Sequence, residues 1–182
     1  MRNQDNRHWP DDYLCSGDGV ILIPVTPDTV NPQTVVAAYE RTKEDGLLTL
    51  VFHREMEMDD FFLYFANPQI HPVLVFWNDL FAGYCWLNGV SESRAFGNFC
   101  FFRSVWGNTI DLGRHVLDYW FAVPGVNGEP LLNVLIGSTP EDNRRAVAFV
   151  RRLGFSVLGV IPHMVGDKPC VISYKTRIEH GR

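Results

Sequence analysis

Leu131–Val165 limits the folds open to this chain more than any other stretch of it. Leu131–Gly137 is a short apolar run of the length of a strand, and Phe155–Val165 is a second run, rich in β-branched residues. Between the two runs, apolar residues recur at intervals of three and four, which is typical of one face of a helix. The stretch therefore predicts a strand, a helix and a second strand in succession.

Both ends of the helix in this unit carry residue types that mark helix boundaries. Thr139 can cap the N-terminus, and Pro140 suits the first helical position. Glu141 and Asp142 favour the positive end of the helix dipole. Gly154 lies where a left-handed C-terminal cap is expected. We therefore expect a helix that begins at Pro140 and ends just before Gly154.

The same unit carries a spaced pattern of an Asn, an Ala, an aromatic residue, a Leu-Gly-Phe triplet and a further Gly. These residues are Asn143, Ala146, Phe149, Leu153, Gly154, Phe155 and Gly159. The pattern resembles the C-terminal signature of the GNAT family of acyl-CoA-dependent N-acetyltransferases. An ordinary amphipathic helix with a glycine cap is the alternative interpretation.

The resemblance implies an α+β fold, with a GNAT-like splayed, mixed β-sheet of about seven strands flanked by about four helices. It also implies transfer of an acetyl group from acetyl-CoA to an amine of a small molecule or protein. The alternative is a catalytically inactive GNAT-fold protein that binds another macromolecule. The acceptor and the oligomeric state, a homodimer included, stay open.

The rest of the chain can be divided into elements in the order that this fold requires. Polar residues 1–17 form an expected N-terminal arm, and residues 18–182 form one domain long enough to bury a core. Hairpin turns are expected at Asn78-Asp79 and Asn88-Gly89. The expected strands are Gly19–Thr26, His71–Trp77, Leu80–Leu87, Phe96–Trp106 and Lys168–Ile178, and the expected helices are Pro32–Glu44, Glu55–Ala66 and Asp111–Val123.

Charge and cysteine content disfavour several classes of function. A net charge of −5 argues against nucleic-acid binding, and the basic stripe Arg144, Arg145, Arg151 and Arg152 is most simply a solvated helix face. The four cysteines lack zinc-ligand spacing, so we expect reduced thiols and no metal. No apolar run reaches membrane-spanning length, and the N-terminus lacks a signal-peptide core. We expect a cytoplasmic protein without a membrane partner.

The resemblance places the cofactor's pyrophosphate at the N-terminus of the helix expected from residue 111, where N–H groups and the helix dipole favour an anion. The family's glycine-rich loop corresponds to residues 108–113, in which only the last small residue is kept. Asp111 stands where glycine is expected, and its charge would repel the phosphates. The cofactor-binding residues that the resemblance implies are Phe101, Phe102, Arg103, Asn108, Leu112, Gly113, Arg114 and Asn143.

Candidates for acid–base chemistry are weak in this sequence. The family's general acid is often a tyrosine at the position that Val150 occupies, and valine has no proton to donate. Ser138, His71 and His163 are polar residues near strand ends, but a structural role is the simpler interpretation of each. His115 falls on the apolar face of its helix. We therefore assign no catalytic residue from the sequence.

Overall fold

The computed structural model describes residues 15–26, 31–125, 128–165 and 167–180. These residues form one eight-stranded sheet in the order β1-β2-β3-β4-β5-β6-β8-β7. The strands are Cys15–Gly17 (β1), Val20–Pro24 (β2), His71–Trp77 (β3), Leu80–Ser91 (β4), Arg94–Phe101 (β5), Val134–Pro140 (β6), Ser156–Val165 (β7) and Lys168–Thr176 (β8). The helices are Pro32–Glu44 (α1), Leu48–Phe52 (α2), Met58–Phe65 (α3), Thr109–Ala122 (α4), Arg144–Arg152 (α5) and Arg177–His180 (α6), with a 3₁₀ turn at Arg103–Val105.

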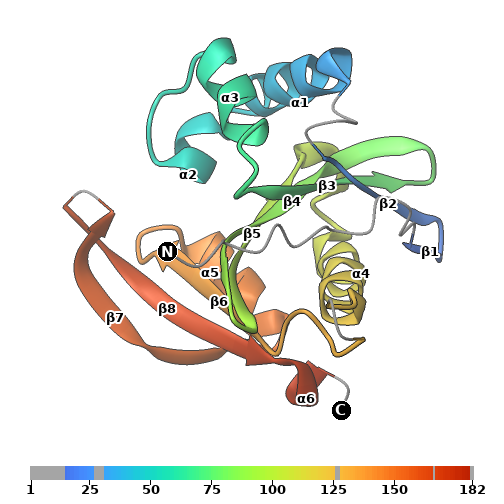
Figure 1. The fold of residues 1–182 in the computed structure, drawn as a ribbon. Coiled ribbons are helices and arrows are strands. Elements are labelled where there is room, and N and C mark those ends of the chain that lie inside the picture. Colours follow the sequence, from blue (N-terminus) through green and yellow to red (C-terminus); the bar gives the residue numbers. More distant parts are fainter. Residues whose placement is uncertain (1–14, 27–30, 126–127, 166, 181–182) are drawn as a thin grey trace, which may run out of the picture.

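Helices cover both faces of the sheet (Figure 1). Side chains of α1, α2 and α3 pack with Tyr84 and Trp86 on one face. Side chains of α4 and α5 pack with Cys85 and Leu87 on the other face. This division follows from β4 itself, since alternate residues of a strand point to opposite faces. The sheet is therefore the middle layer of the molecule.

The sheet is mixed and splits open at β5 and β6, the one parallel pair among the described strands. Strands β1 to β5 are successively antiparallel, and β6, β8 and β7 are antiparallel to one another. Strands β5 and β6 pair in parallel only from Arg94↔Val134 to Phe96↔Ile136. Beyond that point β5 continues to Phe101 and β6 to Pro140, but the two strands no longer pair with each other. The expected splayed α+β fold is confirmed, with β1 as an additional short strand.

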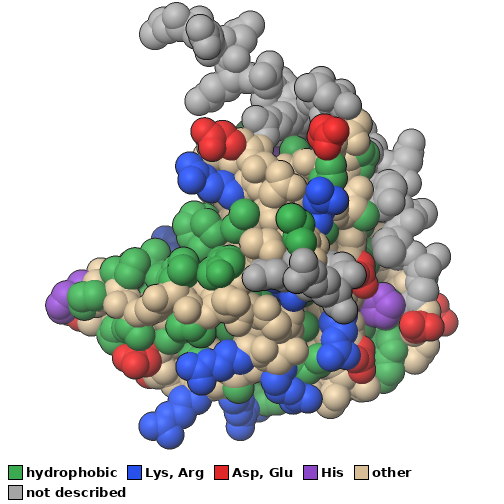
Figure 2. Space-filling model, turned by 90° about the horizontal axis from the view of Figure 1, so that it is seen from below, with side chains coloured by type: hydrophobic (Ala, Val, Ile, Leu, Met, Phe, Trp, Pro, Cys, Tyr) green, Lys and Arg blue, Asp and Glu red, His purple; other side chains and the backbone are tan. Residues whose placement is uncertain are grey.

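Strand β7 forms one edge of the sheet, and most of its side chains are exposed. Figure 2 shows hydrophobic side chains on the left-hand extension of the molecule, the side on which β7 and β8 project in Figure 1. The exposed apolar residues of this strand are Val157, Leu158, Val160, Ile161 and Met164. Among the helices of the described ranges, none has the length and apolarity needed to cross a lipid bilayer.

Several local predictions are confirmed. Asn31 caps α1 by accepting a 2.9 Å hydrogen bond from the Gln33 N–H, and Pro32 takes the first helical position. Asn78 and Asp79 have the positive φ values (48° and 64°) of a tight hairpin turn. Gly154 is left-handed, with φ of 82°. Each of these features depends on residues only a few positions apart.

Several expected boundaries are wrong. The expected strand Phe96–Trp106 is Arg94–Phe101, and the expected strand Leu131–Gly137 is Val134–Pro140. Asn88 and Gly89 do not turn the chain, because β4 continues past them and the reversal occurs at Glu92, whose φ is 55°. The fifth helix begins at Arg144 and not at Pro140, because β6 extends to Pro140 and pairs there with Cys170. The expected helix 55–66 is shorter, and the preceding helix α2 was not predicted. Residues 1–14 of the expected arm lie outside the described residues, and β1 occupies the rest of it.

Candidate functional site

The splay between β5 and β6 opens a cleft of about 490 Å³. One wall is the stretch 97–101 of β5, and the other is the stretch 137–140 of β6 together with α5. Helix α2 and Trp86 line the cleft from the first helical layer, and Trp106 and Thr109 line it where α4 begins. The cleft thus extends from the N-terminus of α4 to α2.

The walls of the cleft carry strand edges that do not pair with each other. Along the splayed stretches 97–101 and 137–140, β5 pairs with β4 and β6 pairs with β8, and the two strands do not pair with each other. The facing edges therefore have peptide groups that can bond to an extended ligand carrying amides, as an added strand would. Gly97 pairs with Leu87 in a continuous part of the β4–β5 ladder, and a Cβ on Gly97 would lie 3.2 Å from the Trp120 ring, so this position has room only for glycine unless that ring shifts.

One end of the cleft combines a helix N-terminus with two arginines. In α4 the Leu112 N–H donates to the Asn108 carbonyl, so the N–H groups that precede it in the first turn have no intrahelical acceptor. The guanidinium carbons of Arg103 and Arg145 lie 5.3 Å and 5.1 Å from the centre of the Trp106 ring. Positive charge and backbone donors therefore meet around Trp106, which makes this end suited to an anion.

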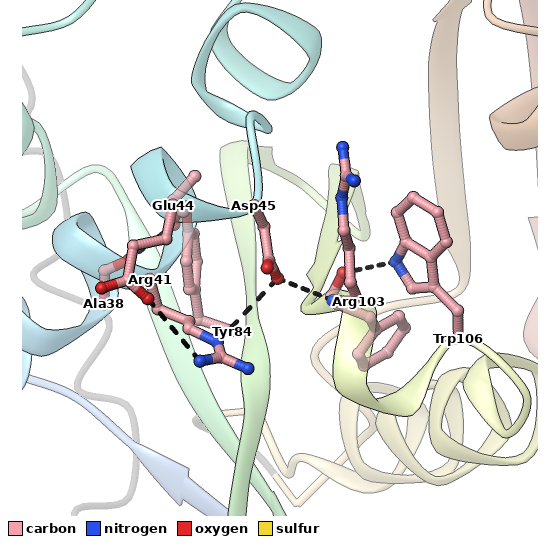
Figure 3. A network of polar contacts seen from close by, with 9 residues as sticks. Ala38, Arg41, Glu44, Asp45, Tyr84, Arg103 and Trp106 are labelled. Carbon is pink, nitrogen blue, oxygen red and sulfur yellow. Dashed lines mark hydrogen bonds and ion pairs between the residues drawn. The ribbon is translucent and has the colours of Figure 1, made fainter.

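The loop that leads into α4 is fixed by two hydrogen bonds. The Arg103 N–H donates to Asp45 Oδ2 at 2.7 Å, and Trp106 Nε1 donates to the Phe101 carbonyl at 3.1 Å. Figure 3 shows Asp45 between Arg41 and Arg103, with Trp106 on the far side of Arg103. Asp45 comes from the end of α1, so the first helical layer positions the anion-binding end of the cleft.

The other end of the cleft is largely apolar. Leu50 and Val51 of α2 contribute to it together with the ring of Trp86. Trp86 is held by stacking on Phe52, with ring centres 5.6 Å apart, and by donating from Nε1 to the Tyr64 hydroxyl at 2.9 Å. The aromatic residues of α3 thus pack in the core, and they contribute to the cleft by holding Trp86 in place.

His53 lines this apolar end and was not identified from the sequence. It follows α2 with a left-handed backbone, at φ of 60°. Partial burial lowers the pKa of its imidazole, the nearby Lys168 ammonium lowers it further, and Asp142 opposes them. No motif surrounds this single histidine in the sequence, so its position in the cleft follows only from the fold.

Two of the sequence-predicted cofactor residues line the cleft, Phe101 and Asn143. Asn143 also caps α5, because its Oδ1 accepts a 3.2 Å hydrogen bond from the Ala146 N–H. Arg103 and Asn108 belong to the loop that leads into α4. These four residues surround the region where the cofactor is expected.

The other four predicted residues lie away from the cleft. Phe102 is fully buried in the layer of α1 to α3. Leu112 and Gly113 are buried because they face inwards, Leu112 in the core and Gly113 against α5. Arg114 is exposed and donates to Asp111 Oδ1 at 2.8 Å. That ion pair offsets the negative charge of Asp111, which by itself would repel an anion at the N-terminus of α4.

The candidate acid–base residues are also separated. Val150 and Ser138 line the cleft, and the Ser138 hydroxyl donates to the Met164 sulfur at 3.6 Å. His163 is exposed, 3.9 Å from Asp167, while His71 is partly buried, which lowers its pKa to about 4. His115 lies 3.9 Å from Asp18. Across the described ranges, no three His, Cys, Asp or Glu residues are grouped to hold a metal.

Comparison with solved structures identifies the fold. The chain superposes on a probable GNAT-family acetyltransferase from Chromobacterium violaceum with a TM-score of 0.76 and 12% identity, over 100% of this chain and 95% of that one. It matches the aminoglycoside acetyltransferase AAC(6')-Ib with ribostamycin and coenzyme A with a TM-score of 0.72 and 16% identity, over 91% of this chain and 97% of that one. It also matches Vibrio cholerae spermidine N-acetyltransferase with CoA and spermine with a TM-score of 0.70 and 13% identity, over 88% of this chain and 98% of that one.

These likenesses show that the chain has the GNAT fold. Sequence comparison finds no matching family model and no significantly similar curated protein. At 12–16% identity, structural likeness establishes architecture, and function must be argued from the site itself.

Proposed function

We propose that this protein is an N-acetyltransferase that transfers an acetyl group from acetyl-CoA to an amine. The observation that carries the proposal is the cleft between β5 and β6, which ends at the N-terminus of α4 beside Arg103, Arg145 and Trp106. GNAT-fold neighbours have coenzyme A or acetyl-CoA bound. The position of an anion site at one end of an extended cleft supports the same ligand here.

The residues present fit acetyl-CoA along its length. The pyrophosphate would lie against the first turn of α4, with Arg103 and Arg145 supplying positive charge. The amides of the pantetheine arm would pair with the free strand edges of β5 and β6. Asn143 would approach the arm from the start of α5. The acetyl group would then lie towards Trp86, where the apolar end of the cleft admits the acceptor.

The acceptor is an amine of a small molecule or a protein. Neighbours with this fold bind aminoglycosides or spermine, or modify the N-terminal serine of a ribosomal protein. In this chain the acceptor end is formed by Leu50, Val51, His53 and Trp86, and it carries no carboxylate among the described cleft-lining residues. This composition supports an acceptor amine attached to an apolar group over a polycation.

The cellular setting that we propose is the cytoplasm. Cys85, Cys100 and Cys170 are buried, unbridged thiols. Burial raises the pKa of the Cys100 thiol to about 12, so this thiol is protonated and unreactive. Reduced cysteines of this kind support a reducing compartment.

An inactive GNAT-fold binding protein is the second candidate function. Val150 favours it, because this cleft-lining position carries no proton for the departing thiolate. The two functions share the fold and differ in acetyl transfer. A protein of the second kind would release no thiol from acetyl-CoA in the presence of amines.

The test is calorimetric titration with coenzyme A, followed by assay of free thiol released from acetyl-CoA with a panel of primary amines. Arg145→Gln should weaken coenzyme A binding several-fold, since an arginine–phosphate contact is lost. Arg151→Gln is the matched control, because Arg151 is on the same helix but does not line the cleft. Equal effects of the two changes, or no binding by the unaltered protein, would contradict the proposal.

A further inference from the structure

His53 lines the apolar end of the cleft, which is the proposed acceptor end. It comes from the end of α2, where its N–H donates to the Thr49 carbonyl. Lys168 Nζ donates to Asp142 Oδ2 at 2.7 Å, and both charges act on the pKa of His53. Lys168 begins β8 and Asp142 precedes α5, so these two charges belong to the β6 side of the splay.

Few groups in the cleft can exchange a proton. Among the described cleft-lining residues, the ionisable side chains are His53, Cys100, Arg145 and Arg152. An arginine guanidinium offers donors and no proton acceptor. The buried Cys100 thiol keeps its proton because its pKa is about 12. Of this set, His53 alone can accept a proton near neutral pH.

We propose that His53 is the catalytic base that takes a proton from the acceptor amine. This inference rests on the proposed acetyl transfer and adds a residue to it. Its basis is geometric: His53 lines the cleft and directly follows Phe52, whose ring stacks on Trp86 with centres 5.6 Å apart, whereas Arg103 and Arg145 lie over Trp106 at the phosphate end. An amine between Trp86 and the β5–β6 gap would lie within reach of the imidazole.

The proposed reaction starts from the ammonium form of the acceptor. His53 takes one proton, which frees the nitrogen lone pair. The nitrogen bonds to the thioester carbonyl carbon, the carbon–sulfur bond breaks, and the nitrogen loses its second proton. The departing thiolate takes up one proton, and His53 releases the other to solvent. The products are one amide, one thiol and one proton.

The surroundings of His53 keep it neutral. Burial is the main cause of its lowered pKa, and the Lys168 ammonium acts in the same direction against Asp142. Arg145 and Arg152 of α5 line the same cleft, and Arg54 and Glu55 follow His53 in the chain. A neutral imidazole at pH 7 is the form that a base requires.

His53→Asn is the informative variant, because asparagine tolerates the left-handed backbone found at this position. We expect coenzyme A binding to stay within about twofold, while the turnover number falls on the order of 10²-fold or more. The acid limb of the pH profile of kcat/KM, which we expect to be shifted to lower pH by the lowered pKa of His53, should disappear. His163→Gln, which changes an exposed histidine outside the cleft, is the control.

A measurement without an acceptor tests the same inference. In NMR titrations of the whole protein, the His53 ring protons should titrate below pH 6.5 and should shift when acetyl-CoA is added. A His53 that titrates above pH 7, or a His53→Asn variant with unchanged turnover and pH profile, would overturn the assignment. Failure of the proposed function is seen separately, as absence of coenzyme A binding or acetyl transfer in the unaltered protein.

Discussion

Asp45, at the end of α1, accepts a 2.7 Å hydrogen bond from the backbone N–H of Arg103, 58 residues later in the chain. Asp45 is almost fully buried, and Arg41 Nε lies 4.0 Å from the same oxygen (Figure 3). The bond joins the first helical layer to the loop that leads into α4. One carboxylate thus links the stability of the fold to the shape of the anion-binding end of the cleft.

Asp45→Ala should therefore destabilise the protein and weaken coenzyme A binding together. Losing this charge-assisted, partly buried hydrogen bond should cost about 2 kcal/mol of unfolding free energy. Urea unfolding and calorimetry measure the two effects. Glu44→Ala is the matched control, because Glu44 is exposed and pairs only with the exposed Arg41, at 3.6 Å. Equal losses in the two variants would show that Asp45 has no special role.

Gly113 brings α4 close to α5. A Cβ at this position would lie 3.0 Å from Leu153 Cδ1 and 3.0 Å from Phe149 Cζ. Gly113→Val should destabilise the protein by about 1–3 kcal/mol, because it overpacks this contact. Gly107→Val is the control, since no atom lies within 4 Å of a Cβ there. Denaturant unfolding measures both, and a Gly113 variant as stable as the control would refute the packing role.

Gly154 ends α5 with a left-handed backbone, at φ of 82°. Gly154→Val should cost about 1 kcal/mol or more, because a β-branched residue is strained in this conformation. Gly154→Asn should cost less, since asparagine tolerates the left-handed region. Thermal unfolding of both variants checks the order, and a valine variant as stable as the asparagine variant would exclude backbone strain as the cause.

Asp111 is paired with Arg114 and does not line the cleft. Asp111→Asn should therefore change coenzyme A affinity by no more than about twofold at moderate salt, as expected for an exposed ion pair. If the Asp111 charge repelled the phosphates, as expected from the sequence, this change would instead tighten binding. Calorimetry at two salt concentrations distinguishes the outcomes, and several-fold tighter binding at low salt would place the phosphates beside Asp111.

His71, the first residue of β3, should contribute to acid instability. Burial lowers its pKa from 6.5 to about 4, so between these values the unfolded chain binds a proton that the folded chain does not. Stability is then complete above pH 6.5 and is lost as the pH falls towards 4, by at most about 3 kcal/mol. His71→Gln should flatten the curve of unfolding free energy in that window. An unchanged slope would contradict the assignment.

The sequence by itself determined the elements whose signals are local. Asn31 and Pro32 begin α1, Asn78-Asp79 turns the chain, and Gly154 ends α5, each through contacts within a few residues. The signature around Asn143 pointed to the splayed fold before any coordinate was known. Such features need no distant partner, because dihedral preferences and capping act within one turn of chain.

The tertiary structure alone decided where strands end and which side chains meet. Pro140 belongs to β6 and not to a helix, because Cys170, 30 positions later, offers it a strand partner. Helix α4 turns Gly113 towards α5, and the end of α2 brings His53 into the cleft. These outcomes depend on pairing and burial between segments far apart in the sequence, whose free energies exceed the preference of any single residue.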